Sequence, residues 1–468
     1  MQSYWEIIER LNGAENKAQR AAIVTETGIS GLPTCAASPA FSHPFFFPLD
    51  PFHLFYENCM PHIWDIWVKD SKEHELVYMR PDIASHLGAE IENAMKTLPP
   101  SFCGPIRDPY KKRQSQYKIY EWMALLHWYI VPIASELGFN SDVVKNFALF
   151  SNIIEYTMTT TSRTDENIKM LHEKIILFLG EFESLYVNDD LSKIGYCRLC
   201  IFQLIFIPHH ISYNGSIRFG SQALCERMIG NIGHGVRSKK SPFQNIVSYK
   251  TDKQSLKMLQ LDYPTLLSEP EVKVIKTLLF REFPITRDEK LENETLQAHL
   301  KEVECYAGLP PDHLLKIKRF GKFHLPNNIT LTSQLFEESK NKTSRSSMYF
   351  EAYLEGAEAL NEPLDECELE EERTKPIFGK ALAFYTIADL NLSLVVYHFL
   401  MNRKKKFGRW SGQWSPDLYV LKTSAIVCLV GIWTHHDNIH ILRRHPGLTL
   451  LTSDECDISD DVVLDDVQ

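Results

Sequence analysis

The chain has 468 residues, of which 44% are hydrophobic and 11% aromatic, and its formal net charge at pH 7 is −10. This composition supplies a large core, enough for two domains, and excludes a chain that is mostly disordered. The first residues lack the basic and apolar regions of a signal peptide, and the longest apolar runs are too short to cross a bilayer. We therefore expect no secretory or transmembrane segment, no membrane partner, and a nuclear or cytoplasmic location.

The acidic residues are concentrated in two stretches. Seven lie between Glu362 and Glu372 and seven more between Asp454 and Asp466, with no basic residue in either stretch. We interpret residues 348–375 as an acidic linker and 451–468 as an acidic disordered tail. Because the rest of the chain is weakly basic, local patches can still bind phosphates. The ten cysteines have no framework spacing, which indicates reduced thiols.

Residues 1–27 predict an amphipathic entry helix, interrupted near Gly13. The chain is then organised around FSHPFFFPLDPFHLFYENC, residues 41–59. An Asp-Pro pair before a periodic apolar run predicts a helix that begins with Asp50 as its N-cap and continues to Trp67.

His53 and Glu57 follow Asp50 by three and seven residues, so all three side chains point to one side of this helix. The spacing of the apolar residues predicts a buried stripe on this helix, made of Leu54, Phe55, Cys59 and Ile63. An acid and a histidine beside aromatic residues indicate a functional site. The alternative is that Asp50 serves only as a helix cap.

A basic loop, GPIRDPYKKR, occupies residues 104–113 and is followed by several aromatic residues. Basic side chains interleaved with aromatic ones are typical of nucleic-acid grooves, so this loop supplies candidate DNA contacts. They are Arg107, Lys111, Lys112 and Arg113. The alternative is that the aromatic side chains belong to the core of the following helix and that the loop is simply solvated.

Residues 80–207 predict a helical insertion, with helices at 80–98, 141–182 and 191–207. Cys197 and Cys200 form a C-x-x-C pair in the last of these helices. Zinc would need a second ligand pair at a workable spacing, and the sequence offers none, so we expect these thiols to pack within the helix.

A second polar motif, SQALCERMIGNIGHGVRSKK, ends at Lys240. Glu226 begins a helix on which Gly230 and Gly233 leave a bare strip beside the carboxylate, where a backbone can approach closely. The basic residues that follow, Arg237, Lys239 and Lys240, are further candidate DNA contacts. The alternative is an ordinary ion pair at Glu226, with glycines that serve helix packing.

Residues 251–347 predict a mixture of short helices and loops. Beyond the acidic linker, 377–387, 392–400 and 419–431 predict strands, joined in part by a charged hairpin-like loop at 403–409. The sequence thus predicts an α+β, mainly helical protein with a small β-rich domain at 376–450.

The ordered motifs GISGLP, FPLDPFHLFYENCMPHIWDIW, GPIRDPYKKRQSQYKIYEWMALLHWY and IPHHISYNGSIRFGSQALCERMIGNIG resemble the CACTA-type (En/Spm-class) transposases in their fungal form. The resemblance covers about Trp5 to Tyr249. It implies that residues 28–250 form the C-terminal part of an RNase H-like domain with a helical insertion. In that family three acids hold two divalent metal ions for DNA strand transfer.

The resemblance assigns roles to three residues. Glu226 matches the last catalytic acid and metal ligand, and Asp50 and His53 match an acid-x-x-His motif that supports the site. The family's first two acids lie in strands upstream of Gly28, where this chain has a predicted helix. We therefore expect a DNA-binding remnant or domesticated transposase, truncated at the N-terminus and inactive by itself.

Two alternatives remain open at this stage. One is an active nuclease that binds Mg²⁺ or Mn²⁺, either because another polypeptide such as a full-length transposase completes the site or because other acids such as Asp65 or Asp108 do so. The other is a degenerate reading frame with no selected function.

Overall fold

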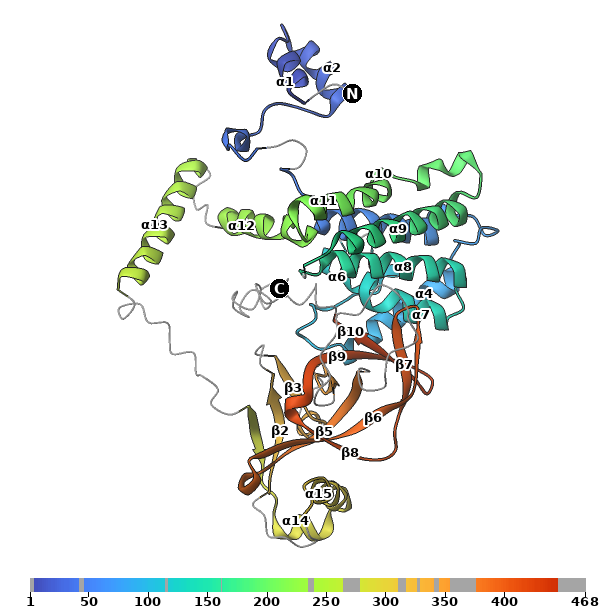
Figure 1. Ribbon diagram of the computed structural model, residues 1–468, viewed down its shortest axis with the longest axis vertical. Coiled ribbons are helices and arrows are strands. Elements are labelled where there is room, and N and C mark those ends of the chain that lie inside the picture. The colour runs from blue at the N-terminus through green and yellow to red at the C-terminus, as the bar shows by residue number, and fades with distance from the viewer. Residues whose placement is uncertain are drawn as a thin grey trace.

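The computed structural model describes residues 4–41, 46–113, 117–160, 162–234, 240–263, 278–309, 317–325, 329–340, 345–353 and 376–444. Helices occupy the first part of the chain and an antiparallel sheet the later part (Figure 1). The α+β class is therefore confirmed. The first strand of the described chain begins at Leu279, so the described part of residues 28–250 is helical, and an RNase H-like sheet there stays a prediction.

The entry segment consists of two helices, α1 (Tyr4–Asn12) and α2 (Lys17–Thr27), with the break at Gly13 where the sequence predicts it. The Asn16 side chain caps α2, and Gly28 ends it with a φ of +73°, which glycine adopts without strain. These helices pack through a small apolar cluster of their own, and Figure 1 shows them at one end of the molecule.

The organising helix begins where expected. The Oδ1 of Asp50 accepts a hydrogen bond from the Phe52 N–H at 3.0 Å, and the Asp50 carbonyl accepts one from Leu54. The helix continues through η2 (Phe52–Cys59), α3 (Met60–Asp65) and η3 (Ile66–Asp70). Leu54, Phe55, Cys59 and Ile63 are all buried, which confirms the predicted stripe.

The first half of this helix has wide, π-type turns, and Pro61 gives a physical reason. Proline has no N–H to donate to the Glu57 carbonyl, and its ring crowds that carbonyl. The backbone widens instead, so that the Met60 N–H bonds to Phe55, five residues earlier.

The helical body surrounds this element. It contains α4 (Pro81–Ala94), η4 (Met95–Thr97), α5 (Pro109–Lys112), α6 (Ile119–Ala124), η5 (Leu125–Tyr129), α7 (Ile130–Glu136), α8 (Ser141–Met158), α9 (Asp165–Phe182) and η6 (Glu183–Val187). The segment 191–207 was expected as one helix, and this was wrong. It divides into η7 (Leu191–Tyr196), α10 (Leu199–Phe202), η8 (Gln203–Phe206) and the start of α11 (Ile207–Asn214). Arg198 has an extended backbone and interrupts the helix.

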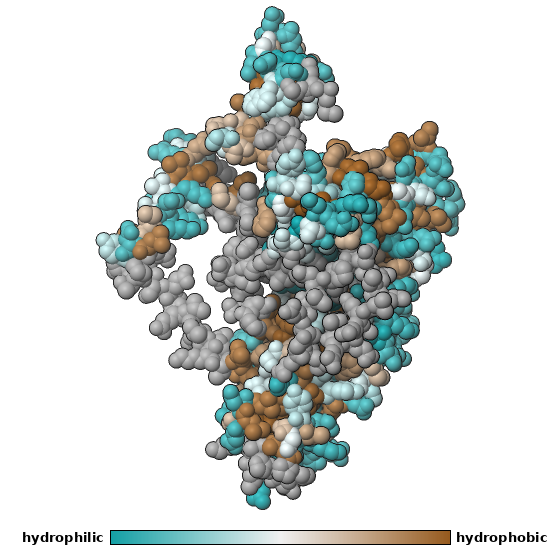
Figure 2. Space-filling model, in the orientation of Figure 1, coloured by the Kyte–Doolittle hydropathy of each residue, from teal (hydrophilic) through white to brown (hydrophobic). Residues whose placement is uncertain are grey.

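Past the helical body, the chain forms η9 (Ile217–Gly220), α12 (Ala223–His234) and α13 (Pro242–Asp262), and Figure 1 shows α12 and α13 extending from one side of the body. Figure 2 shows hydrophobic residues at the outer edge of the body, over α9 and α10. Leu177 of α9 is 50% exposed and Leu199 of α10 is 72% exposed.

The sheet contains ten strands, and each pairing among them is antiparallel. The strands are β1 (Leu279–Phe283), β2 (Ile317–His324), β3 (Thr330–Thr332), β4 (Tyr349–Ala352), β5 (Ile377–Ile387), β6 (Leu392–Lys406), β7 (Arg409–Trp414), β8 (Tyr419–Lys422), β9 (Ile426–His435) and β10 (Asn438–Arg443). The pairings β4–β5–β6–β7–β10–β9–β4 return to their start, so these six strands form a closed ring. Closure removes exposed strand edges.

The strands predicted at 377–387 and 392–400 are confirmed, whereas the one predicted at 419–431 divides into β8 and β9 around η12 (Thr423–Ala425), and the sheet begins earlier than expected. β1 to β3 lie in the region 251–347, and β4 lies within the predicted linker 348–375. The helices α14 (Arg287–Glu292), α15 (Glu294–Tyr306) and α16 (Gln334–Glu338) accompany these strands. The predicted charged hairpin is present, and it turns at Phe407 and Gly408, which both have positive φ. Both acidic stretches lie outside the described residues.

The helical body and the sheet share one core, and side chains of the helical body donate hydrogen bonds to backbone carbonyls of the sheet. Trp128 Nε1 donates to the Arg443 carbonyl at 2.8 Å, and Thr97 Oγ1 donates to the Ile432 carbonyl at 2.5 Å. The two parts therefore pack as one unit. In the described chain, no helix combines the length and the apolar character needed to cross a membrane.

Candidate functional site

The structure brings the two polar motifs together around His53. Its Nδ1 contacts the Asp50 carboxylate, and its Nε2 lies 2.7 Å from Glu226 Oε1 and 3.3 Å from Glu57 Oε2. Asp50, His53 and Glu57 share one side of the organising helix as predicted, while Glu226 comes from α12. The three residues that the sequence analysis singles out as catalytic thus form one cluster, called the His53 cluster below.

Backbone contacts between the two segments hold this cluster. Besides capping its own helix, Asp50 Oδ1 accepts a hydrogen bond from the Gln222 N–H at 3.2 Å, just before α12 begins. Gly220 lies so close to the helix start that an added Cβ would be 2.5 Å from the Leu49 carbonyl oxygen. A glycine is needed at this position because no larger residue allows that approach.

The charges around His53 determine its protonation. Its pKa is raised, first by the hydrogen bond to Asp50 and then by the negative charges of Asp50, Glu226 and Glu57, while partial burial opposes the shift. Both ring nitrogens face carboxylates, which suits an imidazolium that donates two hydrogen bonds. The cationic form of His53 is therefore favoured more than that of an ordinary histidine, and its ring bridges Asp50 and Glu226.

The cluster does not match the ligand set that two divalent metal ions require. Both Asp50 oxygens already accept hydrogen bonds or contact His53. Across the described residues, no group of three His, Cys, Asp or Glu side chains is placed to hold a metal ion. Two Mg²⁺ ions need several converging carboxylate oxygens, more than Asp50 and Glu226 supply here.

The alternative acids have structural partners. Asp65 pairs with Arg113. Burial raises the pKa of Asp65, and the positive charge of Arg113 offsets only part of this rise. Asp108 is buried, caps the short helix α5 through the Tyr110 and Lys111 N–H groups, and closely abuts Gly88. Their contacts explain both acids without a catalytic role.

The candidate DNA contacts of the basic loop are largely engaged within the protein. Arg107 binds the buried carboxylate of Glu121, Arg113 pairs with Asp65, and the ammonium of Lys111 lies 3.1 Å from Asp108. Lys111 and Lys112 remain exposed. Of the aromatic residues after the loop, Tyr117, Trp122, Trp128 and Tyr129 are buried, as the alternative interpretation predicts, whereas Tyr120 is 36% exposed.

The second group of candidate contacts lies mostly outside the described residues. Arg237 and Lys239 are not described, and Lys240 is exposed. Gly230 and Gly233 have open space where a side chain would stand, which is consistent with the predicted bare strip on α12. Cys197 and Cys200 are partly buried, and the Cys200 carbonyl accepts a hydrogen bond from the Cys59 thiol.

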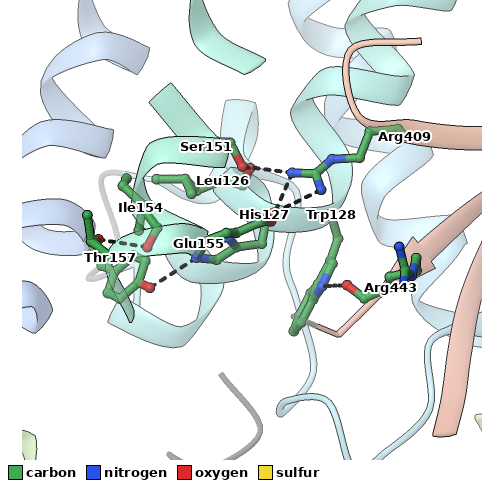
Figure 3. Close-up of polar contacts among 10 residues, drawn as sticks. Leu126, His127, Trp128, Ser151, Ile154, Glu155, Thr157, Arg409 and Arg443 are labelled. Atoms are coloured by element: carbon green, nitrogen blue, oxygen red, sulfur yellow. Dashed lines mark hydrogen bonds and ion pairs between the residues drawn. The ribbon is translucent and has the colours of Figure 1, made fainter. Parts of the chain in front are cut away.

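The sequence analysis missed a second histidine network, shown in Figure 3. His127 Nδ1 lies 3.1 Å from Glu155 Oε1, and its Nε2 lies 3.0 Å from the Tyr56 hydroxyl. Arg409, from the sheet, donates to both oxygens of Glu155 and to the Ser151 hydroxyl. Because these residues come from distant segments with no shared motif, periodicity gave no signal for them.

Burial sets the protonation of this network. The pKa of His127 is lowered, chiefly by desolvation, and that of Tyr56 is raised for the same reason. A neutral His127 donates from Nδ1 to Glu155 and accepts from Tyr56 at Nε2. The network connects the organising helix to the sheet and plays a structural part.

No protein-family model matches this chain, and comparison with curated proteins finds no relative.

Proposed function

We propose that this chain is a remnant or domesticated CACTA-like DNA transposase that binds DNA and is catalytically incomplete by itself. The observation that carries the proposal is the contact between His53 and Glu226 at 2.7 Å. These residues belong to two motifs, far apart in the sequence, that the resemblance assigns to one site. An RNase H-like origin of residues 28–250 belongs to the same proposal.

Binding to DNA is expected to be weak and independent of sequence. The side chains of Lys111, Lys112 and Lys240 are exposed, although the Lys111 ammonium lies 3.1 Å from Asp108, while Arg107 and Arg113 already neutralise carboxylates. Few phosphate contacts give low affinity and a modest number of released counterions, so binding falls as salt rises.

Filter binding at low and moderate salt tests this. Replacing Lys111 and Lys112 together with alanine should weaken binding at low salt and reduce the slope of log affinity against log salt by about one or two. The matched control replaces Lys145 of α8 and Lys169 of α9, which are also exposed, and should leave the slope unchanged. Retention on the filter that ignores ionic strength would contradict the phosphate model.

The expected lack of cleavage has its own test. With Mg²⁺ or Mn²⁺, the purified chain should leave a supercoiled plasmid intact, because the His53 cluster offers too few carboxylate oxygens for two metal ions. Glu226→Gln should bind DNA as the wild type does. Nicking by the wild type that Glu226→Gln abolishes would show that the site is complete.

One observation favours the alternative of a site completed by another polypeptide, such as a full-length transposase. Glu226 is half exposed, and on the same helix Met228 is 55% and Ile229 67% exposed. Apolar residues exposed beside a carboxylate are typical of a helix that packs against a partner. Under this alternative, adding such a transposase would yield metal-dependent nicking that depends on Glu226.

A further inference from the structure

A pocket of about 220 Å³ is lined in part by the two segments that carry the His53 cluster. Pro51 and Phe52 follow Asp50 directly, and Ser221 and Ala223 flank Gln222. The hydrogen bond between Asp50 and Gln222 thus joins the two segments that form one side of the pocket. Any ligand in this pocket lies next to the two motifs.

The other walls combine aromatic, aliphatic and sulfur-containing side chains, and Tyr120 is the most exposed of the aromatic ones. Phe102, Tyr120 and Trp128 line the pocket from three separate segments. The Phe102 and Trp128 ring centroids are 5.1 Å apart with the ring planes tilted by 43°. Met123 and Met158 add polarizable sulfur, which packs well against aromatic rings. Such walls favour a planar, aromatic ligand.

Hydrogen bonds fix these walls in place. The Tyr120 hydroxyl donates to the Pro105 carbonyl at 3.0 Å, and the Trp128 indole donates to Arg443. Arg345 donates to three backbone carbonyls of the adjoining loop, those of Leu98, Pro99 and Cys103. A ligand would therefore enter a preformed pocket and would not have to order it.

The charge of the lining suits a nucleotide. Arg444 lines the pocket, with its guanidinium 5.8 Å from the centroid of Phe102. Burial raises the pKa of the Cys103 thiol to about 11, so this neighbour stays neutral. A cation beside aromatic walls can contact a base edge or the phosphate next to it.

We propose that this pocket holds one nucleobase extruded from the bound DNA, beside the His53 cluster. The volume is below the roughly 300–1,000 Å³ of pockets for drug-sized ligands, and it suits a single planar ring system. Stacking on aromatic side chains tolerates every base, which agrees with binding that does not depend on sequence. This inference rests on the proposed DNA binding and names the part of DNA that reaches the site.

Photochemical cross-linking tests the position of the base. A short single strand that contains 5-iodouracil is bound to the wild-type protein, irradiated, digested and mapped by mass spectrometry. Because iodouracil cross-links to an aromatic ring on which it stacks, the cross-link is expected at Tyr120, which is 36% exposed, whereas Phe102 and Trp128 are almost fully buried. This measurement needs no variant to fold.

A pair of tyrosine variants tests the energetics. Tyr120→Ala should lower the affinity for single-stranded DNA by about tenfold, because it removes one stacking face. The matched control is Tyr110→Ala, on the basic loop and 40% exposed but absent from the pocket lining, and it should change affinity less than twofold.

The outcomes separate the two proposals. Salt-dependent binding with cross-links confined to residues outside the pocket, and with equal affinities for both tyrosine variants, would overturn the base pocket and leave DNA binding standing. A protein that binds no DNA at low salt would overturn both.

Discussion

Two histidines near the organising helix have similar partners and opposite properties. His53 contacts two glutamates and Asp50 at the surface, and its pKa is raised. In the core, His127 contacts Glu155 and also Tyr56 of the organising helix, and the pKa of His127 is lowered. Neighbouring carboxylates favour the charged imidazole in both places, so they cannot explain the difference.

Burial explains it. The His53 side chain is 31% exposed, and its desolvation is too small to offset its hydrogen bond to Asp50. His127 is 1% exposed, and desolvation of the cation exceeds the attraction of Glu155, whose charge Arg409 already balances. Similar residues thus give a charged surface cluster suited to binding and a neutral buried network suited to fold stability.

The largest loss of stability is expected from a substitution that breaks the buried network. Arg409→Ala removes the partner of Glu155, which is left buried beside a neutral histidine. Breaking one side of a buried pair typically costs about 3–5 kcal/mol in the free energy of unfolding. Chemical denaturation followed by circular dichroism measures this loss.

The matched control is Arg80→Ala. Arg80 and Asp82 form an ion pair at 2.8 Å with side chains 62% and 67% exposed, and solvent screens such a surface pair so that it contributes little to stability. If Arg409→Ala destabilises no more than Arg80→Ala does, the buried network does not stabilise the contact between the helical body and the sheet.

The next largest loss of stability is expected from a substitution that pushes apart the two segments of the His53 cluster. In Gly220→Ala the new methyl group would overlap the Leu49 carbonyl oxygen and the Pro48 ring, so the turn must move away from the helix start. We expect a loss of about 1–3 kcal/mol in unfolding free energy, the usual range for overpacking.

Gly180→Ala is the control for this change. Gly180 lies within α9, and its added Cβ meets nothing within 4 Å. Alanine there should stabilise the protein by about 0.5–1 kcal/mol, because glycine costs conformational entropy in a helix. Equal effects of the two substitutions would mean that the approach of Gly220 to Leu49 is unimportant.

The sequence predicted those helices, strands and buried faces that depend on capping residues and on the spacing of apolar residues. The Asp50 cap, the buried stripe that includes Phe55, and the strand Ile377–Ile387 follow from capping and periodicity. The same patterns placed Asp50, His53 and Glu57 on one side of a helix, and the motif resemblance led to Glu226.

The remaining features depend on tertiary contacts. β3 and β4 have three and four residues, too short for a periodic signal, and pairing with β2 and β5 creates them. Arg107 was assigned to DNA because the sequence cannot show that Glu121, fourteen residues later, would meet it as a buried carboxylate. Arg409 and Glu155 meet only because the sheet packs on the helical body.

A pH titration sharpens the comparison between the two histidines. For His53 the folded-state pKa lies above the unfolded value, so its stabilisation is fully present below about pH 6.5 and is lost as pH rises through the raised pKa. For His127 the folded-state pKa is lowered, so protonation of the unfolded chain removes stability as pH falls below about 6.5.

Histidine NMR titration reads both groups in one experiment. The signal absent from a His53→Gln variant should titrate above the range of an ordinary histidine, and that of His127 should titrate below it. His53→Gln should also flatten the decline of stability above neutral pH. If the two histidines titrate together, burial does not separate them.

The smallest expected effects are changes in the pKa of His53 when each of its three neighbouring acids is replaced in turn. Asp50 provides both the hydrogen bond and the largest charge, Glu226 lies 2.7 Å from Nε2, and Glu57 lies 3.3 Å away with 52% of its side chain exposed. Glu226 is 49% exposed, almost as much as Glu57, so distance ranks the two, and the His53 pKa should fall most in Asp50→Asn, less in Glu226→Gln and least in Glu57→Gln. The same NMR titration orders the three variants. A larger fall in Glu57→Gln than in Glu226→Gln would mean that α12 does not hold Glu226 against His53 in solution, and the two motifs would then not share one site.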